Sequence, residues 1–167
     1  MYSIREPQAE ALLRRLCLGV EIIGVRWFAG NVTVILSRVA QESDPPADRI
    51  AFDELLLTVE SRWCVFPSRP ERLPDSEEEL PAPSLEERVA ALACLTGQPI
   101  VDATLGAQCP HLVLTFASGS IFFLNGHHER YETWNLSTVG APSGQDCLIV
   151  AVPGDEVAFT DPAMPRM

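Results

Sequence analysis

The sequence predicts an α+β fold, in which two short helices accompany several antiparallel β-strands. Helical spacing of apolar residues is confined to residues 7–18 and 85–95, whereas most of the remaining chain consists of short apolar runs separated by turn residues. A length of 167 residues corresponds to one ordinary domain. We therefore expect a single domain over residues 1–167.

The two halves of the chain also resemble each other weakly. Residues 16–22 parallel residues 94–100, because in both a short helix runs into a glycine and then into a strand. One helix and a few strands are too small a unit to bury a sheet face alone. We therefore predict two pseudo-repeated units packed as one domain, each a helix followed by an antiparallel β-sheet. The predicted boundaries are 1–66 for the first unit, 67–83 for a Pro- and Glu-rich linker, and 84–160 for the second unit.

The first unit begins with the predicted helix over residues 7–18. Pro7 suits a first helical turn, and Gly19 stands where a helix ends. The apolar residues recur at the spacing of one helical face: Ala9, Leu12, Leu13 and Leu16.

Strand-like runs follow this helix. Residues 20–28 and 32–39 are rich in β-branched side chains and are joined by a short Gly-Asn loop, which predicts a hairpin. Residues 41–48 are polar and predict a loop, and residues 50–66 resume strand character. In the linker, the acidic triplet 77–79 is typical either of a solvated stretch or of an acidic contact surface.

The second unit opens with a helix start signal. Ser84 and Glu87 have the spacing of a capping box, and Leu85, Val89 and Leu92 supply an apolar face. The strand-like runs after the helix are residues 100–105, 112–116, 121–124, 131–136, 148–152 and 157–159.

The charge balance excludes two function classes. The chain has 23 acidic and 12 basic residues, a formal net charge of -11, and every basic residue is Arg. Proteins that bind nucleic acid or anionic membrane surfaces need a surplus of cations. We therefore expect neither nucleic acid nor a membrane as a partner.

Cysteine usage and the chain start indicate the compartment. The first residues lack a signal-peptide pattern, and the longest apolar runs are far shorter than a membrane helix. The five cysteines include no C-x-x-C pair and stand in or beside apolar segments, as expected for buried free thiols. We therefore expect a cytoplasmic protein.

The region around the adjacent His127 and His128 is the only histidine cluster. Adjacent residues on a strand point to opposite faces, so one metal ion would rarely take both rings. No nucleotide-binding, metalloprotease or serine-hydrolase motif is present. We therefore assign no catalytic residue, cofactor or metal. The alternative is a small hydrolase or metal-dependent enzyme that uses His127 or His128 with Glu129, Glu132 or Cys147.

Residues 92–160 resemble a known type of protein. The motifs that carry the resemblance are Gly97-x-x-Ile100, the hairpin over residues 112–121, Tyr131-Glu132-Thr133-Trp134, and the closing turn over residues 152–158. This pattern resembles a family of small uncharacterised bacterial β-rich proteins, some of which look like immunity proteins of polymorphic toxin systems. The motifs are structural, so the resemblance implies a fold and a binding role and transfers no functional residue.

The leading hypothesis is therefore a cytoplasmic protein-binding module, most concretely an immunity protein that neutralises a cognate bacterial toxin by direct binding. Many toxin domains act on nucleic acid and carry basic clefts, to which an acidic partner is electrostatically complementary. The acidic residues expected to contact the partner are Asp44, Asp48, Asp75, Glu77, Glu78, Glu79 and Glu129.

Overall fold

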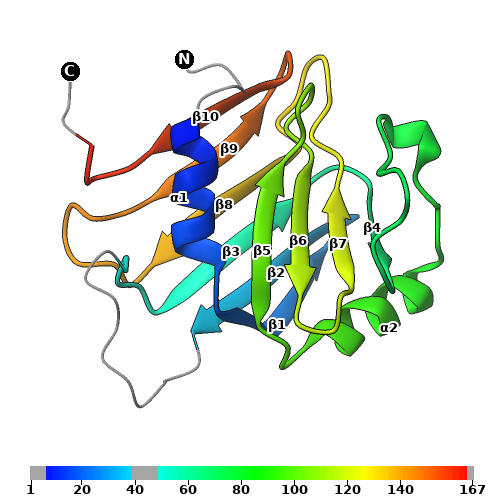
Figure 1. Cartoon of the computed structure of the whole chain (residues 1–167), viewed down its shortest axis with the longest axis horizontal. Coiled ribbons are helices and arrows are strands. Elements are labelled where there is room, and N and C mark those ends of the chain that lie inside the picture. The colour runs from blue at the N-terminus through cyan, green and yellow to red at the C-terminus, as the bar shows by residue number, and fades with distance from the viewer. Residues whose placement is uncertain (1–6, 39–48, 165–167) are drawn as a thin grey trace.

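The computed structural model describes residues 7–38 and 49–164, and over these ranges two α-helices accompany two antiparallel β-sheets (Figure 1). The α+β class predicted from the sequence is therefore confirmed. The six-stranded sheet has the order β1 (Val20–Phe28), β2 (Asn31–Arg38), β3 (Glu54–Val59), β8 (Trp134–Val139), β9 (Leu148–Val152), β10 (Glu156–Thr160). The four-stranded sheet has the order β4 (Trp63–Phe66), β7 (Ile121–Leu124), β6 (Leu112–Phe116), β5 (Ile100–Leu105).

Both sheets contain strands from both halves of the chain. In the six-stranded sheet β3 pairs with β8, and in the four-stranded sheet β4 pairs with β7. The strand character predicted over residues 50–66 is divided between β3 and β4, because the chain leaves one sheet after Val59 and enters the other at Trp63. Strand pairing thus does not confirm the pseudo-repeated units, which stay a prediction.

Helix α1 (Pro7–Cys17) lies beside β5 at the edge of the four-stranded sheet (Figure 1). The N–H of Gly19 donates to the carbonyl of Ile100 at 2.9 Å, and Arg14 pairs with Asp102 at 2.7 Å. The predicted apolar face is buried in the main core, which also contains inward side chains of both sheets, such as Trp134. Helix and small sheet together therefore cover the six-stranded sheet.

Helix α2 (Leu85–Leu95) begins with the predicted capping box. The N–H of Glu87 donates to Ser84 Oγ at 3.2 Å, and the N–H of Ser84 donates to the Glu87 carboxylate at 2.7 Å. The predicted apolar face is only partly correct, because Leu85 and Val89 are exposed whereas Leu92 and Leu95 are buried. The helix contacts β4, and the guanidinium carbon of Arg88 lies 5.9 Å from the centroid of the Trp63 ring on that strand.

The Pro- and Glu-rich segment 67–83 packs on the outer face of the four-stranded sheet. It contains the short 3-10 helix η1 (Glu77–Glu79), and the next residue, Leu80, is buried. Leu80 and the half-buried Leu73 belong to a second apolar cluster, whose sheet residues are Cys64, Val113, Ile121 and Phe123. This packing fixes the acidic triplet in place at one side of the sheet.

Two further predictions concern cysteines and membranes. Cys17, Cys64 and Cys147 are buried as expected, whereas Cys94 is exposed and Cys109 is half-buried. In the two ranges that the structure describes, no helix is both long enough and apolar enough to cross a membrane.

Candidate functional site

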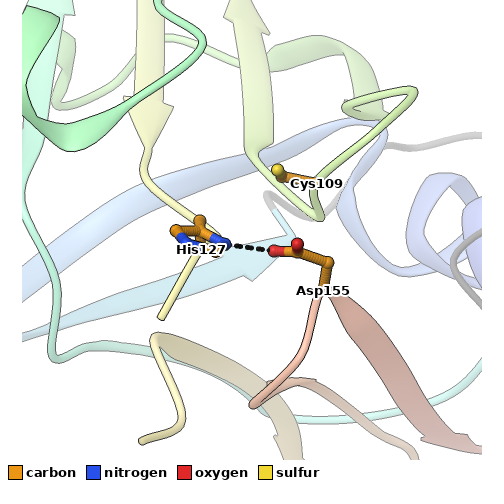
Figure 2. A group of neighbouring side chains, drawn as sticks. All are labelled: Cys109, His127 and Asp155. Atoms are coloured by element: carbon orange, nitrogen blue, oxygen red, sulfur yellow. Dashed lines mark hydrogen bonds and ion pairs between the residues drawn. The ribbon is translucent and has the colours of Figure 1, made fainter. Parts of the chain in front are cut away.

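Three loops meet beside the ends of the two sheets and bring together Cys109, His127 and Asp155 (Figure 2). Cys109 comes from the β5–β6 loop, His127 from the segment after β7, and Asp155 from the β9–β10 turn. The sulfur, one ring nitrogen and one carboxylate oxygen all lie within 4.8 Å of one another. His127 Nδ1 and Asp155 Oδ1 are 2.5 Å apart.

A close approach of two backbones places Cys109 and His127 in reach of each other. A Cβ atom built on Gly126 would lie 2.0 Å from the carbonyl oxygen of Pro110, so only glycine fits there. The N–H of Gly126 donates to His111 Nδ1 at 2.9 Å. The residue after Cys109 is thus packed directly against the residue before His127.

The side chain of Asn125 fixes the backbone of His127. Asn125 is fully buried, its amide nitrogen donates to the His127 carbonyl at 2.9 Å, and its amide oxygen accepts from the His127 N–H at 3.2 Å. Both backbone groups of His127 are satisfied by one side chain, which leaves the imidazole as the part that points outward. The sequence signal is the Asn-Gly pair, which indicates a turn.

Buried polar side chains likewise fix the loop that carries Cys109. Trp134 Nε1 donates to the Pro110 carbonyl at 2.8 Å. His111 Nδ1 accepts from Gly126, so its Nε2 carries the proton and donates to the carbonyl of Asp75 at 3.2 Å. Burial lowers the pKa of His111 below its ordinary value, consistent with a neutral, structural imidazole.

Asp155 lies in a left-handed backbone conformation at the end of a tight turn. Gly154 has φ 84° after Pro153, as expected for the second central position of a type II turn, and Asp155 has φ 62°. Aspartate tolerates this region better than most residues. The turn holds the Asp155 carboxylate against His127.

The groups around the Cys109 thiol determine whether it is protonated when no cation is bound, and hence whether it can act as a nucleophile. Burial is the largest of the effects that together raise the pKa of Cys109 to about 11; the others are the charge of the Asp155 carboxylate, the hydrogen bond that this carboxylate accepts from the thiol, and the charge of Asp75. The thiol is therefore protonated at neutral pH. A cysteine nucleophile needs the opposite, a thiolate stabilised by positive charge.

A polar cleft of about 420 Å³ adjoins His127 and collects several of the predicted acidic residues. It is lined by Glu77, Glu78, His127, His128, Glu129, Arg130 and Tyr131. Segment 77–79 and residue 129 are thus brought together from distant parts of the chain.

The remaining predicted partner contacts have other positions. Asp75 and Glu79 both pair with Arg72, at 2.5 and 3.0 Å, on an exposed surface beside the cleft. Asp44 and Asp48 lie outside the described residues.

The residues named for the alternative enzyme are only partly brought together. His128 Nδ1 accepts from the N–H groups of Arg130 and Tyr131, so this atom is used within its own loop. Cys147 lies in the core, where its N–H donates to Thr138 Oγ1 at 2.9 Å. The pairing of Cys147 with a histidine is therefore wrong: the cysteine beside His127 is Cys109.

Comparison of the chain with protein-family models, with curated proteins and with solved structures finds no match.

Proposed function

We propose that this chain is a protein-binding module whose acidic cleft receives a basic surface of a partner protein, most concretely as an immunity protein that neutralises a toxin. The observation that carries the proposal is the convergence of Glu77, Glu78 and Glu129 on one cleft. These residues belong to segments separated by about 50 positions, and the packing of segment 67–83 on the small sheet supports their alignment.

The charge of the cleft fits such a partner. The lining residues include three carboxylates and the guanidinium of Arg130, and Glu77 also pairs with Arg62 at 3.7 Å. Three carboxylates therefore stand against two guanidinium groups at the cleft. The whole chain carries a net charge of -11. A negative cleft on a negative protein steers a basic partner toward it and speeds encounter at low ionic strength.

Aromatic surface beside the carboxylates adds contact area. Tyr131 is 66 % exposed, and its ring lies 4.9 Å from that of His128. Exposed tyrosines at the centre of a binding surface are typical interface anchors, because they bury a large area at low entropic cost. The expected interface thus has an aromatic centre and an acidic surround.

The toxin-neutralising role rests on the resemblance of residues 92–160 to a family of small bacterial β-rich proteins, some of which look like immunity proteins. Its physical basis is complementarity, because a toxin that acts on nucleic acid carries the cationic surface that this cleft would cover. Neutralisation then requires only tight binding and no chemistry by this chain.

The experiment is co-purification with the product of the adjacent gene, followed by association kinetics at low and high salt. The double variant Glu78→Arg/Glu129→Arg is expected to slow association by about tenfold or more at low salt. The matched control is Glu21→Arg/Glu86→Arg, which changes the net charge equally on β1 and α2, away from the cleft. Equal slowing in both variants, or no complex with the adjacent product, contradicts the proposal.

A further inference from the structure

We propose that Cys109, His127 and Asp155 form a binding site for one divalent transition-metal ion of the zinc class, with a fourth position left for water or an incoming ligand. This inference is independent of the proposed protein partner. The sequence patterns alone predict no metal site and do not indicate that Cys109, His127 and Asp155 lie together.

The donor set selects the class of ion. One sulfur, one imidazole nitrogen and one carboxylate oxygen suit a borderline ion such as Zn²⁺, whereas Mg²⁺ and Ca²⁺ prefer sites built from oxygen alone. Three protein ligands plus one open position are typical of zinc sites that bind a further molecule.

The distances between the three donor atoms suit a zinc ion after a small side-chain movement. Zinc bond lengths of about 2.0–2.3 Å place tetrahedral ligand atoms about 3.3–3.8 Å apart. The three donor atoms already lie within 4.8 Å of one another. His127 Nδ1 and Asp155 Oδ1, now 2.5 Å apart, must separate by about 1 Å to admit an ion at such bond lengths. Their side chains are 46 % and 33 % exposed, so rotation at the surface can provide this movement.

The backbone positions of the ligands are fixed without any ion. Asn125 holds His127, Trp134 holds the carbonyl next to Cys109, and the close contact at Gly126 joins the two loops. A site whose supporting shell is already in place needs little ordering when the ion binds.

Nearby charge also favours a cation. The charge of Asp75 reaches the Cys109 thiol, and Glu78 lines the same cleft as His127. Arg130 is the opposing charge in the adjacent cleft. Asp75 and Glu78 would attract a divalent ion in addition to the three ligands, because each nearby carboxylate attracts a cation.

Bound metal would connect the two sheets. Cys109 belongs to a loop of the four-stranded sheet and Asp155 to a turn of the six-stranded sheet. An ion between them joins the layers at the rim of the core. It is therefore expected to raise the thermal midpoint of unfolding as its concentration increases.

The test is a titration of the reduced, metal-free full chain with Co²⁺ and Zn²⁺. We expect one equivalent of Co²⁺ to produce a thiolate-to-cobalt charge-transfer absorption, which Zn²⁺ then abolishes by displacement. Cys109→Ser, His127→Ala and Asp155→Asn should each weaken Zn²⁺ affinity by about 100-fold or more, since each removes a ligand and second-shell changes alone cost about 10–100-fold. Circular dichroism of each variant checks that it is folded.

The matched controls are Cys94→Ser and His128→Ala. Cys94 is an exposed thiol on α2, and His128 is the next residue to the proposed ligand. Neither should change affinity by more than about twofold. The inference is overturned if the folded wild-type chain gives no charge-transfer band, if the three ligand variants bind as well as wild type, or if Cys94→Ser removes the band.

Discussion

The backbone N–H of Gly126 donates to the ring of His111 at 2.9 Å, and this bond joins the loop of His127 to the loop of Cys109. The two loops approach so closely that a Cβ at position 126 would lie 2.0 Å from the Pro110 oxygen. The positions of Cys109 and His127 are therefore set by the packing of their two backbone loops against each other.

Gly126→Ala is expected to destabilise the fold by about 2–4 kcal/mol, because the methyl group forces the two loops apart and breaks the bond to His111. Urea denaturation followed by circular dichroism measures the loss. Gly24→Ala in β1 is the matched control, since its Cβ would meet Ile35 at an ordinary 3.4 Å. Equal loss in both variants would contradict the role given to Gly126.

Asn125→Ala removes two part-buried hydrogen bonds to the backbone of His127. We expect a loss of about 1–3 kcal/mol in the free energy of unfolding, because the freed backbone groups lose their buried partner. Backbone amide exchange at His127 should also accelerate. Asn135→Ala on β8 serves as the control. Unchanged amide exchange at His127 in Asn125→Ala would show that the Asn125 side chain does not hold the His127 backbone.

Trp134→Phe removes the indole N–H that donates to Pro110 and leaves a void in the core. Since Trp134 is fully buried, the expected cost is about 2–4 kcal/mol, read from the urea midpoint. Trp27→Phe, at a position that is 37 % exposed, should cost less than about 1 kcal/mol. A loss at Trp134 no larger than at Trp27 would show that the indole does not hold the loop.

Stability is expected to fall at alkaline pH because of buried thiols. Burial raises the pKa of Cys17 to about 12, and burial raises the pKa of Cys64 to about 12 as well, from an ordinary value of 9.0. At pH values between about 9 and about 12, the thiols of the unfolded chain have lost protons that the folded chain still holds. The unfolded state then binds fewer protons, so the free energy of unfolding decreases as pH rises from about 9 to about 12.

Urea denaturation at about pH 8 and about pH 10.5 measures this slope. Cys17→Ala should make the slope shallower, whereas Cys94→Ala, at an exposed position, should leave it unchanged. An identical slope in wild type and Cys17→Ala would contradict the assignment.

The sequence predicts local structure well where the signal is local. The hairpin of β1 and β2, the capping box of Ser84 and Glu87, and the apolar face of α1 follow from spacing alone, and all are observed. The apolar face of α2 is the exception. Leu85 and Val89 have helical spacing but face solvent, whereas Leu92 and Leu95 of the same helix are buried.

The site could be predicted only in part, because it is assembled by packing. Glu77, Glu78 and Glu129 were selected for their charge, but their meeting in one cleft depends on how segment 67–83 crosses the small sheet. The sequence suggests Cys147 as the thiol for His127, whereas the structure places Cys109 there; Cys109 and Asp155 lie 18 and 28 positions from His127, and no spacing rule joins them. The Asn125-Gly126 pair was the local signal, and it indicated a turn without showing which loop it would touch.

The most direct test of the site as a whole is a ¹H–¹⁵N NMR titration of the metal-free chain with Zn²⁺. We expect the amide shifts to saturate at one equivalent and to be confined to residues 106–111, 125–131 and 153–156, because these three loops form one site. Shifts centred on Cys94 or spread over the acidic surface, or the absence of saturable shifts in the three loops, would contradict it.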